Sequence, residues 1–204
     1  MRKKSFSRIV LLSCGIAGSV LFIAIYLLFG FATPNFNILR DTISSLELVK
    51  NGWIQQMNFI IFGVFTLLFT AGLAKELIKG LNALLIVVFQ SLIAIGLIGD
   101  GIFIHDPLHM VCDLITFNSV LVVLFLFTWQ FYKSTNWKGW IIYSVLTAFL
   151  MMIFLLAFGI ANARHGMAGL YERLAVLPRT IWSILLIVKM VNGRELVNRE
   201  DFNR

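Results

Sequence analysis

The stretch Leu81–Ile104, LNALLIVVFQSLIAIGLIGDGIFI, decides the fold class, because it is a nearly uninterrupted apolar run. About 20 consecutive apolar residues cross the hydrocarbon core of a bilayer as an α-helix. The chain contains further runs of this kind at residues 9–32, 53–74, 114–132, 140–161 and 174–191, the last interrupted by Pro178 and Arg179. The sequence therefore predicts an all-α membrane protein, a six-helix transmembrane bundle, with residues 1–204 as one domain.

The composition supports a membrane protein and argues against a nucleic-acid binder. Of the 204 residues, 59% are hydrophobic and 13% are charged, whereas a soluble domain carries about a quarter charged residues. The net charge is +7, but the basic residues cluster at the ends of the apolar runs and form no basic face with interleaved aromatic residues. We therefore expect membrane lipid as a partner and no nucleic acid. No feature identifies a protein partner.

The distribution of basic residues predicts the orientation in the membrane. Most of the 17 Lys and Arg residues lie in the amino-terminal tail, the second and fourth loops and the carboxyl-terminal end. Because loops rich in Lys and Arg remain in the cytoplasm, both termini are predicted to be cytoplasmic. The first apolar run is longer than the core of a signal peptide, so we expect an uncleaved first helix.

This topology places most of the chain's reactive side chains at the outer membrane face. Ionisable groups at membrane depth are costly, and they tend to face a bundle interior and to serve a function. The sequence therefore predicts an outer polar pocket. Its candidate residues are Asp41, Ser44, Asp100, His105, Asp106, His109, Asp113, Asn162, Arg164, His165, Glu172, Arg173 and Arg179.

The segment Gly99–Asp113, GDGIFIHDPLHMVCD, is the densest part of this set. Asp106 followed by Pro107 is typical of an N-cap and the first residue of a helix. The fourth helix would then begin at Pro107, and His109 and Asp113 would share one of its faces.

Three interpretations of His109 and Asp113 remain open. They can be a hydrogen-bonded pair that fastens two helices. They can ligate a metal such as zinc, with His105 or His165 completing the ligand set. Alternatively, His109 can act as a general base that Asp113 orients. Haem bound between His109 and His165 is disfavoured, because both histidines lie at loop depth.

Two further candidates involve charged or hydroxyl groups. Asp100 lies four residues inside the predicted third helix, about 6 Å deep, and can pair with Arg179. In the functional alternative, a lipid phosphate is bound by Arg179, Arg173 or Arg164. Ser44 and Glu47 fit a capping box, although Ser44, near Asp41, can also be a nucleophile. No Gly-x-Ser-x-Gly motif supports that role.

The chain resembles the bacterial membrane-protein family called domain of unknown function 998, over roughly residues 34–190. The resemblance rests on these motifs in order: RDTISSLEL (Arg40–Leu48), NGWIQQMNFIIFG (Asn51–Gly63), GLIGDGIFIHDP (Gly96–Pro107), HMVCDLITFNS (His109–Ser119) and GLYERLAVLPRTIW (Gly169–Trp182). The family commonly places more residues between its Asp-Pro and the next His than the single Leu108 found here. A fainter similarity links the chain to the eukaryotic Frag/DRAM/Sfk proteins, which are associated with lipid handling.

The resemblance implies six spans and a multi-pass protein of the bacterial cytoplasmic membrane, but it supplies no reaction. Two function classes are therefore expected. The first is a protein that binds or organises lipid through the outer polar pocket. The second is a membrane-embedded lipid hydrolase or transferase that uses His109, Asp113 and His165. A transporter is less favoured, because the charged residues gather at one membrane face.

Overall fold

The computed structural model describes residues 6–77, 80–104, 106–134 and 137–192. These residues form six long helices and one short 3₁₀ helix, η1 (Ser44–Leu48), and contain no strand. All six long helices are long and apolar enough to cross a membrane, so the predicted six-span bundle is confirmed. They are α1 (Phe6–Ala32), α2 (Trp53–Leu73), α3 (Leu81–Ile102), α4 (Pro107–Tyr132), α5 (Lys138–Ala163) and α6 (Ala168–Val191).

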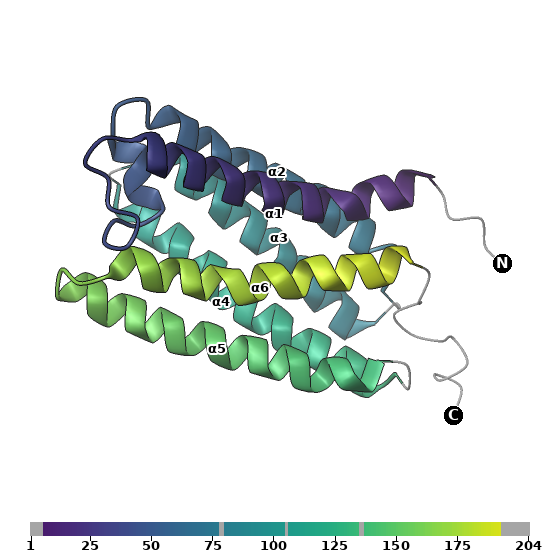
Figure 1. Cartoon of the computed structure of the whole chain (residues 1–204). Helices are drawn as coiled ribbons and strands as arrows, with labels where there is room; N and C mark the ends of the chain where they lie inside the picture. The colour runs from purple at the N-terminus through teal and green to yellow at the C-terminus, as the bar shows by residue number, and fades with distance from the viewer. Residues whose placement is uncertain (1–5, 78–79, 105, 135–136, 193–204) are drawn as a thin grey trace.

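The helices form a closed ring. Each helix packs against the next one in the chain, and α6 returns to pack against α1 (Figure 1). One end of the bundle carries the α1–α2 loop of residues 33–52 and the turns from α3 to α4 and from α5 to α6; we call it the long-loop end. Helix α1 begins and α6 ends at the opposite end. The ring thus surrounds an interior to which every helix contributes.

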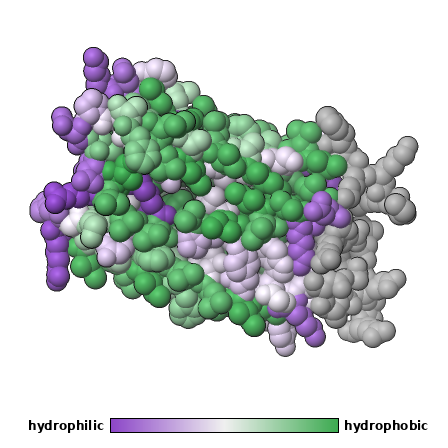
Figure 2. All heavy atoms as spheres, in the orientation of Figure 1, coloured by the Kyte–Doolittle hydropathy of each residue, from purple (hydrophilic) through white to green (hydrophobic). Residues whose placement is uncertain are grey.

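The outer surface of the ring is apolar. Leu28 and Leu156, for example, are 70% and 68% exposed. Figure 2 shows hydrophobic side chains around the middle of the bundle and hydrophilic ones toward its ends. An apolar belt of this extent is not stable in water, but it matches the hydrocarbon core of a bilayer.

Glycines allow α3 and α4 to approach closely. A Cβ atom on Gly96 would lie 2.9 Å from the main-chain oxygen of Cys112, and one on Gly99 would collide with the Cys112 side chain. On the other side of α3, a Cβ on Gly101 would meet Gln56 and Ile60 of α2. These glycines therefore allow close packing of α3 against α2 and α4, as small residues do between membrane helices.

Helix α4 begins where the Asp106-Pro107 signal predicts. Asp106 has an extended backbone, and its Oδ1 accepts a hydrogen bond of 2.8 Å from the main-chain N–H of Leu108. Pro107 is the first helical residue. The apolar run starts several residues later, at Leu114, because the first turns of α4 lie at the end of the bundle.

Helix α6 begins at Ala168, earlier than the apolar run suggests, and continues through Pro178. Its first turn is capped from the α1–α2 loop. The N–H groups of Gly169 and Leu170 donate to the carbonyl oxygens of Arg40 and Leu39 at 3.1 Å and 2.9 Å. Helix N-termini carry unpaired donors, and this loop satisfies two of them.

The predicted capping box at Ser44 and Glu47 is wrong, although a short helix does occur there. The N-cap residue of η1 is Ile43, which makes no side-chain capping hydrogen bond. Thr42 has the local role instead, because its Oγ1 accepts from the N–H of Ser45 at 3.2 Å. Glu47 does not reach back along the chain, since its side chain is buried and turned toward α4.

Candidate functional site

A cavity of about 100 Å³ lies inside the ring. All six helices and the α1–α2 loop contribute to its wall. The apolar part of the wall is rich in aromatic residues and the polar part carries both acids and a base. The lining residues are Gly15, Ser19, Phe22, Ile43, Phe59, Phe62, Thr66, Phe69, Ile93, Leu97, Asp100, Asp113, Thr116, Phe117, Val120, Met151, Glu172, Val176, Arg179, Thr180 and Ser183.

The charged residues of this wall were all predicted from the sequence as members of one pocket: Asp100, Asp113, Glu172 and Arg179. Asp100 is the most enclosed of the acids, with 1% of its surface exposed. Its Oδ1 is buried and has no hydrogen-bond partner. A buried polar atom without a partner is costly, so this carboxyl group is a candidate for binding something other than the protein.

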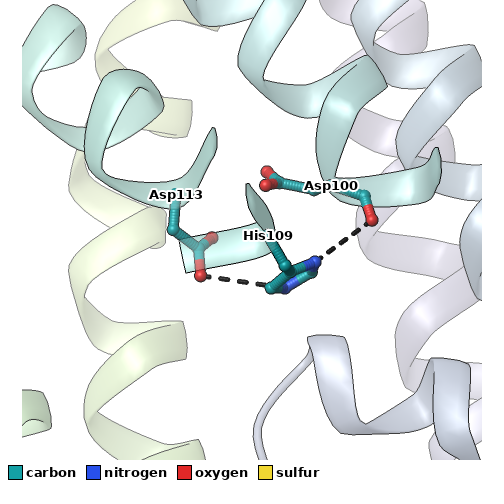
Figure 3. Close-up of side chains that lie close together, drawn as sticks. All are labelled: Asp100, His109 and Asp113. Atoms are coloured by element: carbon teal, nitrogen blue, oxygen red, sulfur yellow. Dashed lines mark hydrogen bonds and ion pairs between the residues drawn. The ribbon is translucent and has the colours of Figure 1, made fainter. Parts of the chain in front are cut away.

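His109 lies between the two aspartates of this end of the cavity (Figure 3). Its Nδ1 is 3.2 Å from the main-chain oxygen of Asp100, and its Nε2 is 3.8 Å from Oδ2 of Asp113. His109 and Asp113 therefore share one helical face, as predicted, but they form no direct hydrogen bond. One ligand atom from each of Asp100, His109 and Asp113 lies within 4.8 Å of the others, so this group could hold a metal ion.

Glu47 of η1 joins this group from the α1–α2 loop. Its Oε2 lies 4.0 Å from Nδ1 of His109, and its Oε1 is buried without a partner. Burial, together with the smaller effect of the negative charge of Asp113, raises the pKa of the Glu47 carboxyl from 4.5 to about 8. The loop thus brings another acidic group against the imidazole.

Arg179 occupies a different depth from the aspartates. It lies about halfway along α6, whereas Asp100 is close to the end of α3. At 1.5 Å per residue the two positions differ by roughly 13 Å along the bundle. No ion pair forms between them, so the predicted pairing of Asp100 with Arg179 is wrong. The sequence placed Arg179 too near the membrane face because α6 was expected to begin at residue 174.

Arg179 instead contacts Gln90 and Trp182. Its Nη2 donates to Oε1 of Gln90 at 3.2 Å, and the guanidinium carbon lies 5.5 Å from the centre of the Trp182 ring. Its Nε is buried and has no hydrogen-bond partner. The guanidinium therefore retains donor capacity in the cavity.

Arg173 has a structural role in the described region. Its Nη1 donates to the main-chain oxygens of Ile38, Asp41 and Gly169 at 2.8, 3.0 and 2.8 Å. The Asp41 carboxyl accepts from the N–H of Asn37 at 2.7 Å. These bonds hold the α1–α2 loop on α6. Neither side chain lines the cavity.

The remaining sequence candidates lie apart from the cavity or outside the described residues. His165 is exposed, with a positive φ of 51°, in the turn between α5 and α6, and Arg164 beside it is also exposed. The Ser44 hydroxyl lies 3.3 Å from that of Thr42. His105 lies outside the described residues. Cys14 and Cys112 are free.

Two residues of the site, Glu47 and Gln90, were not predicted from the sequence as site residues. Glu47 was interpreted as a helix cap, because three-residue spacing from Ser44 fits that motif. Gln90 stands in the middle of the run Leu81–Ile104, and a polar side chain at the centre of a membrane span is itself a signal of function. Gln90 is 1% exposed and is the partner of Arg179.

The closed ring of membrane-crossing helices, with its apolar exterior and charged interior cavity, defines a multi-pass integral membrane protein. Residues 16–189 match the model of the family described as "Protein of unknown function (DUF998)". The chain belongs to this family, as its motifs suggested. No curated protein and no solved structure matches the chain significantly.

Proposed function

We propose that this protein binds a phosphate-bearing membrane lipid inside its helix ring. The observation that carries the proposal is the composition of the cavity wall. Arg179 lies in this wall with an unpartnered Nε, and phenylalanines from α1, α2 and α4 line the same cavity. A site that combines charged groups with apolar side chains fits an amphiphile, and Arg179 is the only basic residue among the four charged residues that line this cavity.

The apolar part of the wall would contact hydrocarbon. Phe59, Phe62 and Phe69 of α2 line the cavity together with Phe117 and Val120 of α4. A cavity of about 100 Å³ holds only part of a lipid, so the rest of the molecule would extend out of the ring. We therefore propose an organising or presenting role, in which one segment of the lipid is enclosed.

The polar part of the wall would bind the headgroup. Guanidinium groups bind phosphate through two parallel hydrogen bonds, and the Nε of Arg179 has no competing partner. Each hydrogen bond to a charged group contributes about 1.5–3 kcal/mol. Loss of the guanidinium should therefore lower lipid affinity by about tenfold or more.

The lipid proposal is tested by pairing neighbouring substitutions on α6. Val176→Phe would fill the cavity, whereas Leu177→Phe adds the same ring to a residue that is 44% exposed. The probe is a phosphatidylglycerol with a diazirine in one acyl chain, in phosphatidylethanolamine vesicles that contain the protein. Cross-links should map to Phe62 and Phe117 in wild type and in Leu177→Phe, and should be lost in Val176→Phe.

A second pair of variants tests the headgroup. Arg179→Gln should reduce the cross-linking yield, while Arg164→Gln, which changes an exposed arginine, should not. Equal cross-linking in wild type, Val176→Phe and Arg179→Gln would show that the lipid lies on the outer surface and would end the proposal.

We further propose that the protein resides in the bacterial cytoplasmic membrane with both termini in the cytoplasm, so that the long-loop end faces outward. The excess of Lys and Arg at the opposite end supports this orientation. In a background of Cys14→Ser and Cys112→Ser, an impermeant thiol reagent should label Asn162→Cys in intact cells and Lys75→Cys only after lysis. The reverse pattern would invert the topology.

A lipid hydrolase or transferase is the second candidate, and the contacts of His109 favour it. A general base needs an oriented imidazole, and His109 is held by Asp100 on one side and faces Asp113 on the other. Mass spectrometry of phosphatidylglycerol vesicles incubated with the protein tests this reading. Product that forms with wild type and with His165→Ala, but not with His109→Ala, would favour the enzyme.

A further inference from the structure

Acidic groups gather at the long-loop end of the ring, and among the described residues none of them forms an ion pair with Lys or Arg. Glu47, Asp100, Asp113 and Glu172 come from η1, α3, α4 and α6. An uncompensated buried charge costs several kcal/mol, so this cluster favours the binding of a cation.

Two of these acids also have unused oxygen atoms that are fully enclosed. Asp100 is 1% exposed and Glu47 is 6% exposed. Oδ1 of Asp100 and Oε1 of Glu47 have no hydrogen-bond partner. Most buried polar atoms in proteins are paired, and unpaired carboxylate oxygens next to one imidazole point to a missing ligand.

The imidazole of His109 is oriented as a metal ligand is. A main-chain carbonyl oxygen can only accept, so Nδ1 of His109 must carry the proton that it donates to Asp100 at 3.2 Å. In the neutral ring this leaves a lone pair on Nε2, the nitrogen that faces Asp113. Metal-bound histidines almost always donate their other N–H to a carbonyl or carboxylate in this way.

The distance between His109 and Asp113 also fits two ligands better than a direct contact. The separation of 3.8 Å between Nε2 and Oδ2 is too long for a hydrogen bond. Two ligand atoms with bonds of about 2.1 Å to one ion lie roughly 3.0–3.4 Å apart. A small rotation of the Asp113 side chain, which is 41% exposed, would close this difference.

We propose that Asp100, His109 and Asp113 bind a divalent transition-metal cation. One ligand atom from each of the three lies within 4.8 Å of the others (Figure 3). Carboxylates suit Mn²⁺ and imidazole suits Zn²⁺, so this mixed donor set favours those two ions. Glu47 lies 4.0 Å from Nδ1 of His109, too far for a hydrogen bond, and places a further acidic group beside the ring.

The metal site rests on its own observations and does not require the lipid proposal. Asp100 and Asp113 also line the cavity, so the ion would lie at its border. Metal binding is therefore measured in detergent without added lipid. The Val176→Phe variant separates the proposals, because it should lose the lipid cross-link and keep the metal.

The test uses the full chain without a polyhistidine tag, stripped with EDTA and titrated calorimetrically with ZnCl₂ and with MnCl₂. Wild type should bind one equivalent of at least one of these ions. Asp100→Asn, His109→Ala and Asp113→Asn should bind it at least about tenfold more weakly. Asp106→Asn and His165→Ala, which change nearby groups outside the cluster, should match wild type.

Spectroscopy keeps the proposal testable if a variant does not fold. Electron spin echo measurements on the Mn²⁺-loaded wild type should detect a directly bound imidazole nitrogen. A wild type without saturable binding of either ion, or bound Mn²⁺ without a nitrogen ligand, would overturn the proposal. So would affinities in Asp100→Asn and Asp113→Asn equal to that of wild type.

Discussion

Glu172 of α6 accepts a hydrogen bond of 2.6 Å from the main-chain N–H of Ile43, a residue 129 positions earlier in the chain. Both residues line the cavity. This bond is one of several that join the α1–α2 loop to α6, the helix that closes the ring. It holds Ile43 in the cavity wall and keeps η1, with Glu47, next to α4.

Removal of the Glu172 carboxyl group should destabilise the loop. Glu172→Ala leaves the buried N–H of Ile43 without an acceptor, which costs about 1–3 kcal/mol. Glu172→Gln keeps an oxygen that can accept the bond, and it should cost less. Unfolding titrations with sodium dodecyl sulfate measure both variants. Equal losses would mean that the charge of Glu172 matters and the hydrogen bond does not.

Gly96 should be far less tolerant of substitution than Gly159. A Cβ atom on Gly96 would press into Cys112 and Thr116 of α4, whereas one on Gly159 meets nothing within 4 Å. Overpacking of this kind costs about 1–3 kcal/mol, so Gly96→Ala should lower the thermal unfolding midpoint in detergent. Gly159→Ala should leave it unchanged or raise it, because alanine favours helix. A tolerated Gly96→Ala would show that α3 and α4 can separate.

The stability of the first turn of α4 should depend on the side-chain oxygen of Asp106, its N-cap residue. Asp106→Ala removes the acceptor for the N–H of Leu108 and should cost about 0.5–2 kcal/mol. Asp106→Asn retains an oxygen in the same place and should behave like wild type. Hydrogen exchange of the amides in the first turn of α4 reports the effect. Faster exchange in both variants would contradict a capping role.

The raised pKa of Glu47 should make the stability of the EDTA-treated protein depend on pH. Its pKa is raised from 4.5 to about 8 in the folded state. Between these values the folded protein holds a proton that the unfolded chain has released, so stability falls as pH rises. The stabilisation is complete below pH 4.5 and lost above about pH 8.

The Glu47→Gln variant isolates this effect, because glutamine cannot ionise. Wild type should lose stability relative to the variant by up to roughly 1.4 kcal/mol per pH unit between the two pKa values. Unfolding midpoints of both proteins across this range give the difference directly. Parallel curves would mean that the carboxyl group of Glu47 is hydrated at all pH values.

Local sequence signals were sufficient to predict the six membrane-spanning helices and the position at which α4 begins. The apolar runs predicted all six spans, because a bilayer of fixed thickness requires a minimum length of apolar helix. Asp106 and Pro107 located the start of α4, since N-capping depends only on adjacent residues. The start of α6 was predicted too late, because its first turn is capped by carbonyl oxygens from the distant α1–α2 loop.

The candidate site was predicted only in part, for a related reason. The topology assigned Asp100, Asp113, Glu172 and Arg179 to one pocket, and all four line the cavity. It also assigned His165 and Arg173 to this pocket, but neither lines the cavity. The reason is that residues at the same membrane depth can face different directions around the ring. Glu47 was assigned to the wrong partner, since a capping motif and a tertiary contact use the same carboxyl group.

By itself the sequence determined a six-span membrane bundle and the helical face shared by His109 and Asp113, because these depend on local spacing. Only the tertiary structure decided which polar groups meet. It brings Glu47 to His109 and Gln90 to Arg179, and it keeps Arg179 away from Asp100. Which side chains come into contact depends on how each helix is rotated about its axis and how deep it lies in the bundle. Both are determined by packing around the whole ring.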